Sequence, residues 1–218
     1  MKRNHCPNCL RAERACICGC VLACQNHTSI GVLQHPSERL QAKGSARLAA
    51  LSLQCSVLWS GERLADAALE LVNGQTVIAK EASHLTLHDW LAKKPTFLLY
   101  PETQEKSEKT GHQTIPAGQL VKLGQTMPFQ ILVLDGTWRK THKMLMLNPE
   151  LQALPRVTIL PSKPSQYQIR KQKNAHSLAT IEAIAQLLAM LEVTSHSASR
   201  LEQSFANMQQ KLVALRED

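Results

Sequence analysis

The sequence predicts an α/β protein with a largely parallel sheet, preceded by a small cysteine-rich segment. From residue 30 onward, short β-rich apolar runs alternate with helical stretches, a pattern typical of parallel sheets covered by helices. Six of the seven cysteines fall within the first 24 residues. With 218 residues, 44% of them apolar, the chain can form one core of ordinary size plus a small appendage. We therefore expect a cysteine-rich unit over residues 1–28 and one α/β domain over residues 29–218.

The expected strands are short apolar runs bounded by polar or turn-forming residues. They cover residues 30–34, 55–59, 76–79, 96–100, 130–134 and 157–160. Helices are expected over residues 46–53 and 138–147, the second beginning soon after a strand. Residues 102–125 are rich in Lys, Glu, Gly, Thr and Gln, which predicts a long solvated excursion.

The C-terminal third is predicted to be helical, because apolar residues recur there at helical spacing. The two stripes contain Leu178, Ile181, Ala185, Leu188 and Leu191, and then Leu201, Phe205, Met208, Leu212 and Leu215. Both stripes are expected to be core or dimer contacts, so the protein could be a monomer or a homodimer.

Net charge and hydropathy restrict the classes of partner and the cellular compartments that we expect for this protein. Lys and Arg number 25 against 17 Asp and Glu, a formal net charge of +8, which favours a polyanionic partner such as nucleic acid or an acidic membrane face. Apolar runs such as 131–134 are far shorter than the roughly 20 residues that span a bilayer. The basic N-terminus is not followed by an apolar signal-peptide stretch. We expect a cytoplasmic protein without a membrane-spanning segment.

In a reducing compartment, a dense group of cysteines favours a metal ion over disulfides. Cys6 and Cys9 are separated by two residues, and this spacing lets two thiolates reach one ion from a tight turn. Cys16 and Cys18 can complete a tetrahedral Zn²⁺ site from a second turn, which predicts a structural zinc knuckle within residues 1–28. Competing ligands are Cys20, Cys24 and, more weakly, His5. The alternative is a tail of free thiols.

A second motif follows the expected strand 130–134, where Asp135 precedes Gly136, Thr137 and Trp138. A carboxylate in this position should lie at the carboxyl edge of the sheet, where open α/β folds bind their ligands. Glycine lets a ligand approach the backbone closely. An Asp-Gly-Thr turn is also a common way to end a strand, and Thr137 could simply cap the next helix.

Residues 139–176 are strongly basic, with eight Lys or Arg residues and a single acid. Such an imbalance is typical of phosphate-backbone contacts, and Trp138, Tyr167 or His176 could stack on an unpaired base. The alternative is a solvated basic surface without a partner. After the first strand, His35, Glu38 and Arg39 are further candidates for substrate contact, with surface ion pairing as the alternative.

Together these motifs resemble the DTW-domain family, which takes its name from the sequence found here at Asp135, Thr137 and Trp138. The other matching segments are the cysteine quartet, His35-Pro36-Ser37-Glu38, Leu99-Tyr100-Pro101, Ser165-Gln166-Tyr167-Gln168-Ile169-Arg170 and Thr180-Ile181-Glu182-Ala183. The resemblance extends in order from Cys6 to about Leu191. No single segment is decisive, but the ordered set is highly specific.

The resemblance implies a tRNA-uridine aminocarboxypropyltransferase. Such an enzyme moves the 3-amino-3-carboxypropyl group of S-adenosylmethionine to a ring nitrogen of uridine and releases methylthioadenosine. It also implies a SPOUT-like fold, with helices on both faces of a mostly parallel sheet and a C-terminal trefoil knot. Candidate S-adenosylmethionine contacts are Leu99, Tyr100, Pro101, Leu134, Gly136, Thr137 and Trp138. Candidate tRNA contacts are His35, Arg39, Arg139, Lys140, Lys143, Tyr167, Arg170 and Lys171.

In this interpretation Asp135 is the catalytic residue. It is the hypothesised general base that removes the ring proton of uridine. The alternative is that its carboxylate receives the ammonium of the methionyl group. The rival functions are a SPOUT-type RNA methyltransferase and a non-catalytic, zinc-containing RNA-binding protein.

Overall fold

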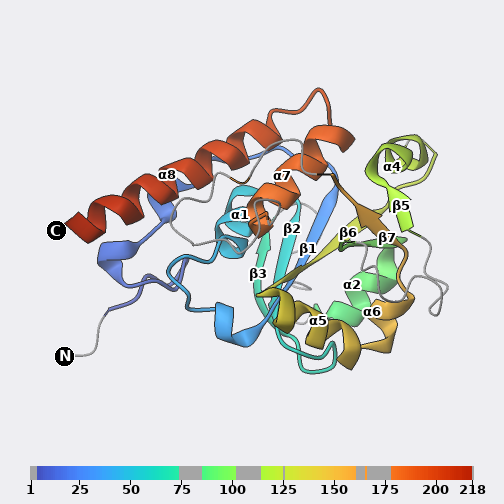
Figure 1. The fold of residues 1–218 in the computed structure, drawn as a ribbon, viewed down its shortest axis with the longest axis horizontal. Coiled ribbons are helices and arrows are strands. Elements are labelled where there is room, and N and C mark those ends of the chain that lie inside the picture. Colours follow the sequence, from blue (N-terminus) through green and yellow to red (C-terminus); the bar gives the residue numbers. More distant parts are fainter. Residues whose placement is uncertain are drawn as a thin grey trace.

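The computed structural model describes residues 4–73, 85–101, 114–124, 126–160, 165 and 178–217. Its seven described strands form one sheet in the order β3-β2-β1-β6-β4-β7-β5 (Figure 1). Every neighbouring pair is parallel except β2 with β3. The prediction of a largely parallel sheet is therefore confirmed. The strands are β1 (Ser29–Gln34), β2 (Ser56–Ser60), β3 (Ala68–Asn73), β4 (Thr96–Leu99), β5 (Thr114–Pro116), β6 (Gln130–Asp135) and β7 (Arg156–Thr158).

Helices cover both faces of the sheet, as predicted (Figure 1). One face carries α1 (Ala46–Ser52), α4 (Ala117–Gly124), α7 (Thr180–Leu191) and α8 (Ser197–Glu217). The other carries α2 (Leu87–Lys93), α5 (Trp138–Leu147) and α6 (Pro149–Ala153). The two faces follow from the alternation of side chains along each strand. In β6, Ile131 and Val133 pack on the first face, whereas Leu132 and Leu134 pack on the second.

Both C-terminal stripes form core contacts within the chain. Ile181, Ala185 and Leu188 of α7 are almost fully buried, and so are Leu201 and Met208 of α8. The two helices pack against each other and against α1. None of the described helices is long and apolar enough to cross a membrane.

The cysteine-rich segment packs directly on the α7–α8 face. It contains the short 3₁₀ helices η1 (Glu13–Ala15) and η2 (Cys18–Cys20), both of which contact α8. Ile17 is fully buried in the same apolar cluster as α8. The Arg11 guanidinium donates hydrogen bonds to the carbonyl of Gly44 and to the sulfur of Met208, at 2.5 and 3.3 Å. The segment therefore shares its core with the α/β domain.

The prediction of a solvated excursion over residues 102–125 is wrong for residues 114–124, which form β5 and α4. Ile115 pairs with Val157 of β7, and Leu120 is fully buried. The prediction was dominated by the strongly polar residues 102–113, which hid the short apolar stretch that follows them. The sequence also left β3, α2 and α6 without a prediction. The predicted strand 76–79 lies outside the described residues.

The last predicted strand ends earlier than expected. β7 ends at Thr158, and Leu160 is 92% exposed, so the chain has left the sheet by that residue. The implied C-terminal knot stays a prediction, since residues 161–164 and 166–177 lie outside the described part of the chain.

Candidate functional site

The four predicted zinc ligands come together in space. The sulfurs of Cys6, Cys9, Cys16 and Cys18 all lie within 4.8 Å of one another. The Cys6–Cys18 and Cys9–Cys16 sulfur pairs are 3.6 and 3.7 Å apart. Four sulfurs at the usual zinc–sulfur distance of about 2.3 Å are about 3.8 Å apart along each edge of a tetrahedron. The quartet therefore fits a zinc ion.

The local backbone favours the thiolate form of one of these cysteines, Cys6. Hydrogen bonds from the backbone of Cys9 and Asn8 lower the pKa of Cys6 to about 6. A thiolate is the form that binds a metal ion. Burial is the main cause that raises the pKa of Cys18, and a bound cation would offset this cost by stabilising the thiolate.

The competing cysteines lie elsewhere. Cys20 and Cys24 are buried in the apolar core beneath the quartet. The Cys24 thiol donates to the carbonyls of Leu22 and Ser197. Because neither sulfur belongs to the group of four, the geometry favours Cys6, Cys9, Cys16 and Cys18.

Asp135 is the last residue of β6 and lies at the carboxyl edge of the parallel sheet. It pairs in register with Gln34, the last residue of β1, and its side chain is 7% exposed. The Gln34 amide donates to Oδ2 at 2.9 Å. The Thr180 hydroxyl donates to Oδ1 at 2.5 Å. The carboxylate therefore connects two strand ends to the first turn of α7.

The start of α7 is held by a second carboxylate. Glu182 accepts hydrogen bonds from the backbone N–H of Ala179 and from the hydroxyl of Ser165, both at 2.7 Å. Thr180 belongs to the same turn and reaches Asp135. Three segments that are far apart in the sequence, around residues 135, 165 and 180, therefore meet at one end of α7.

An aromatic stack lies beside this junction. Tyr100 follows β4, and Trp138 is the first residue of α5. Their ring centroids are 5.3 Å apart with an interplanar angle of 21°. The guanidinium carbon of Arg156 lies 5.5 Å from the centroid of the Tyr100 ring. Trp138 is 54% exposed, whereas Tyr100 is buried, so the stack presents one indole to solvent.

The other predicted cofactor residues surround this stack in different environments. Leu99 and Leu134 are buried in the sheet, on opposite faces, and Pro101 is exposed. Gly136 is packed tightly, because a Cβ there would come within 3.2 Å of the Lys140 Cβ. Thr137 is the N-cap residue of α5, yet its side chain makes no capping hydrogen bond.

Several buried polar atoms near this edge have no hydrogen-bond partner within the described chain. They are Oε1 of Gln34, the hydroxyl of Tyr100 and Nε of Arg156. Burial raises the pKa of Tyr100, and Thr141 and Arg156 oppose that shift. A buried polar group without a partner is costly, so these three atoms are positioned to bind a polar ligand or water. Sequence reasoning missed Gln34, which carries neither a charge nor a motif of its own, and it named Thr180 only as part of a matching segment, without a role.

An open hollow of about 670 Å³ lies over the exposed side of α5. We call it the α5 hollow. Its lining residues are His35, Thr137, Arg139, Lys140, His142, Lys143 and Met146. It thus brings together four of the predicted tRNA contacts, namely His35, Arg139, Lys140 and Lys143. Tyr167, Arg170 and Lys171 lie outside the described residues.

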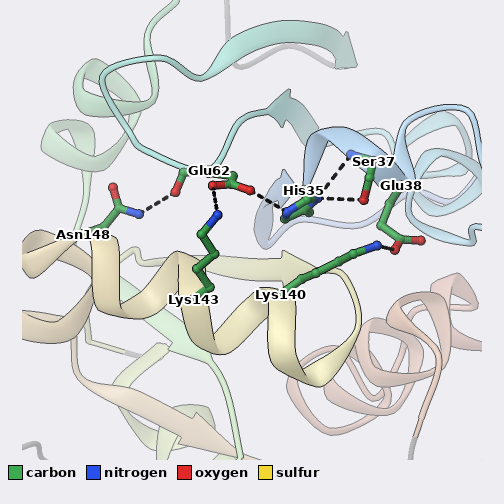
Figure 2. A network of polar contacts seen from close by, with 7 residues as sticks. All are labelled: His35, Ser37, Glu38, Glu62, Lys140, Lys143 and Asn148. Carbon is green, nitrogen blue, oxygen red and sulfur yellow. Dashed lines mark hydrogen bonds and ion pairs between the residues drawn. The ribbon is translucent and has the colours of Figure 1, made fainter.

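Acids from other elements neutralise part of this basic surface. Glu38, in the 3₁₀ helix η3 (Pro36–Glu38), binds Lys140, and Glu62 binds Lys143, each at 2.6 Å (Figure 2). The predicted tRNA contact Arg39 is likewise paired, with Glu70 at 2.5 Å. The count of eight basic residues against one acid missed these partners, because they lie far from residues 139–176 in the sequence.

The imidazole ring of His35, at the edge of the hollow, is oriented by hydrogen bonds on both of its nitrogens. Its Nδ1 accepts from the backbone N–H of Ser37 at 3.1 Å, so the proton of the neutral ring is on Nε2. Nε2 lies 2.8 Å from Oε1 of Glu62, to which it donates (Figure 2). Lys143, the largest cause, and His35 both lower the pKa of Glu62. Glu62 therefore stays ionised at neutral pH.

The fold and site define a class of protein: a largely parallel α/β domain with a four-cysteine knuckle that fits a zinc ion, and with a buried aspartate at the carboxyl edge of its sheet. The model of the DTW domain matches residues 3–213, nearly the whole chain. The chain therefore belongs to the DTW-domain family.

Three curated relatives of the chain carry the same name. The chain is 28% identical over 196 residues to a Drosophila melanogaster protein named tRNA-uridine aminocarboxypropyltransferase 2, covering 88% of this chain and 68% of that protein. Proteins of the same name from Macaca fascicularis and Mus musculus are each 25% identical, over 89% and 88% of this chain. The chain spans only 59% and 57% of their lengths. No solved structure matches the chain.

Proposed function

We propose that this protein is a tRNA-uridine aminocarboxypropyltransferase that uses S-adenosylmethionine as its donor. The observation that carries the proposal is the juxtaposition of Asp135 with an exposed aromatic platform and a basic hollow at one edge of the sheet. The names of the curated relatives support this choice of reaction. The reaction forms a bond from a uridine ring nitrogen to the γ-carbon of the methionyl group. The sulfur–carbon bond breaks, methylthioadenosine leaves, and the ring proton is lost.

The chain's task in such a reaction is mostly positioning. A sulfonium has three carbons open to displacement, so the product depends on which carbon faces the nucleophile. The buried polar atoms of Gln34, Tyr100 and Arg156 support a polar ligand at the sheet edge. Backbone groups around Pro101 and Gly136 are the proposed contacts for the adenosine.

Asp135 is proposed to receive the positive charge of the donor. Its two oxygens accept hydrogen bonds from the neutral donors Gln34 and Thr180, and such bonds stabilise the ionised carboxylate. A carboxylate held in this way is well suited to bind an ammonium and less suited to remove a proton. We therefore favour the anchoring role of Asp135 over the role of general base, with the uridine proton leaving to water or phosphate.

Trp138 is proposed to stack on a base of the donor or of the RNA. We expect Trp138→Ala to weaken that ligand by about 1–3 kcal/mol, or roughly 5- to 150-fold, because stacking on an exposed indole is lost. Trp138→Phe, which keeps an aromatic face, is expected to lose clearly less. Isothermal titration with S-adenosylmethionine and with tRNA will show which ligand is affected. Equal affinities of the alanine variant and the wild type for both would contradict the role.

The tRNA is proposed to lie along the α5 hollow, with its phosphates on Arg139, Lys140 and Lys143. Arg139 is exposed and forms no ion pair within the described part of the chain, so it is the most available cation. Arg39, Tyr167, Arg170 and Lys171 remain proposed contacts outside this hollow. The zinc ion is proposed to be structural, since four cysteine ligands leave no open position for a substrate.

The decisive experiment uses purified protein, unmodified tRNA and two labelled forms of S-adenosylmethionine. Label in the aminocarboxypropyl chain should enter the tRNA, and label in the methyl group should leave with methylthioadenosine. Entry of the methyl label instead would show a methyltransferase. Tight tRNA binding with no transfer of either label, and no thermal shift with S-adenosylmethionine, would point to a non-catalytic RNA-binding protein.

A further inference from the structure

The lysines of the α5 hollow are already bound to carboxylates of the same chain. Lys140 and Lys143 lie one turn apart on α5, and each ammonium lies 2.6 Å from an acid, Glu38 or Glu62 (Figure 2). The two acids come from separate places, η3 and the loop after β2. An RNA phosphate that binds either lysine must therefore share its ammonium with a carboxylate or displace that carboxylate.

Glu62 is fixed independently of Lys143. Its backbone carbonyl accepts a hydrogen bond from the Asn148 side chain at 2.8 Å, and its Oε1 is bound to Nε2 of His35 (Figure 2). His35 is in turn fixed by Ser37. When Lys143 moves to a phosphate, Glu62 stays in place as a negative charge beside that phosphate.

The Lys143–Glu62 ion pair is too exposed to serve mainly for stability, and the Lys140–Glu38 pair is partly exposed, with side chains 31% and 12% exposed. The side chains of Lys143 and Glu62 are 58% and 31% exposed, and exposed ion pairs contribute about 0–1 kcal/mol to folding. The ion pair between Arg47 and Glu70 differs, because its side chains are only 6% and 9% exposed. That pair also anchors the carbonyl of Asn8 in the knuckle, through Arg47, and is structural.

We propose that Glu38 and Glu62 are intramolecular competitors of RNA phosphate for Lys140 and Lys143. They make the α5 hollow bind RNA more weakly than its lysines alone would. This inference rests on the proposed function only in taking tRNA as the ligand. It explains why two acids lie in a hollow that is proposed to bind a polyanion: they moderate its affinity.

The test is a set of binding measurements with full-length protein and tRNA at two salt concentrations. We expect Glu38→Gln/Glu62→Gln to bind tRNA about 3- to 10-fold more tightly at low salt, with a steeper salt dependence, because both lysines become available to phosphate. The control is Glu202→Gln, which removes an exposed acid from α8 on the other face of the sheet and should leave the affinity unchanged.

The same substitutions in a protein that lacks both lysines distinguish competition for the lysines from general electrostatic repulsion of the RNA. In Lys140→Ala/Lys143→Ala protein, the same two glutamine substitutions should raise affinity by less than about 2-fold, because the groups they release are absent. The inference is overturned if the glutamine variant binds no more tightly than the Glu202→Gln control. It is also overturned if the gain is undiminished in the alanine background. Thermal melts identify any unfolded variant, and the single Glu62→Gln variant then provides the same comparison.

These outcomes are independent of the transfer reaction. Wild-type protein that binds tRNA but transfers no label would contradict the proposed function and leave the competition intact. If the wild-type protein transfers label fully but the Glu38→Gln/Glu62→Gln variant binds tRNA no more tightly, the proposed function stands and the competition is wrong.

Discussion

Asp135→Asn is expected to lower kcat/KM for aminocarboxypropyl transfer by about 10²–10³-fold, the usual cost of losing one preorganised electrostatic contact. The substitution removes the negative charge while nearly keeping the volume. It also places an amide where both Gln34 and Thr180 donate hydrogen bonds, so one oriented contact is lost. Steady-state kinetics with purified tRNA will measure the change.

Two further variants make this result interpretable. Asp66→Asn alters an exposed acid in the loop after β2 and should leave the kinetics unchanged. Thr180→Val removes one donor to Asp135 and should lower kcat/KM by a smaller factor, about 10-fold, because the carboxylate keeps its charge but loses its orientation. If Asp135→Asn is folded, as judged by its melting temperature, and transfers at the wild-type rate, the proposed role of this residue is wrong.

Removal of the metal is expected to destabilise the whole domain and not the knuckle alone. Binding of a structural zinc contributes directly to folding, and here Ile17 and Cys20 of the knuckle are part of the core under α8. We expect Cys9→Ser, or exhaustive chelation, to lower the melting temperature by about 5–10 °C, since about 1 kcal/mol corresponds to roughly 2–4 °C for a chain of this size. Differential scanning calorimetry will measure the shift.

The matched control is Cys55→Ser, which changes a half-buried cysteine outside the quartet. It should retain about one zinc per chain, measured by metal analysis, whereas Cys9→Ser should not. Loss of zinc is also expected as the pH falls, because protons compete with the ion for the thiolates. The pKa values of Cys16 and Cys18 are raised, so these two ligands are expected to be protonated before Cys6. A wild-type protein that contains no zinc, or a Cys9→Ser protein that melts with the Cys55→Ser control, would refute this prediction.

Much of the fold could be predicted because its signals are local. The helix over residues 138–147 begins and ends where the sequence indicated, because a buried strand, a turn and an amphipathic segment follow one another without interruption. The central strands were found because β1, β2 and β6 are buried on both faces and carry a short apolar run between their polar ends. The edge strands β3 and β5 were missed, because a half-exposed edge carries mixed residues.

The cysteine quartet and Asp135 could likewise be identified from the chain alone. Both are indicated by residue type and by spacing along the chain, so each can be identified without knowing which distant residues it contacts. The sequence also placed Asp135 correctly at the carboxyl edge, because the end of a buried parallel strand has only one location in such a sheet.

What only the tertiary structure decided is which distant groups meet. Thr180 reaches Asp135 across 45 residues, and Lys140 and Lys143 meet Glu38 and Glu62 across 102 and 81 residues. A hydrogen bond or an ion pair depends on atoms within about 3–4 Å, and no pattern along the chain fixes that distance between separate elements. The sequence alone thus determined the class of fold, the cysteine quartet and the position of Asp135 at the carboxyl edge of the sheet. Packing determined which groups hold the aspartate and which lysines are paired with acids.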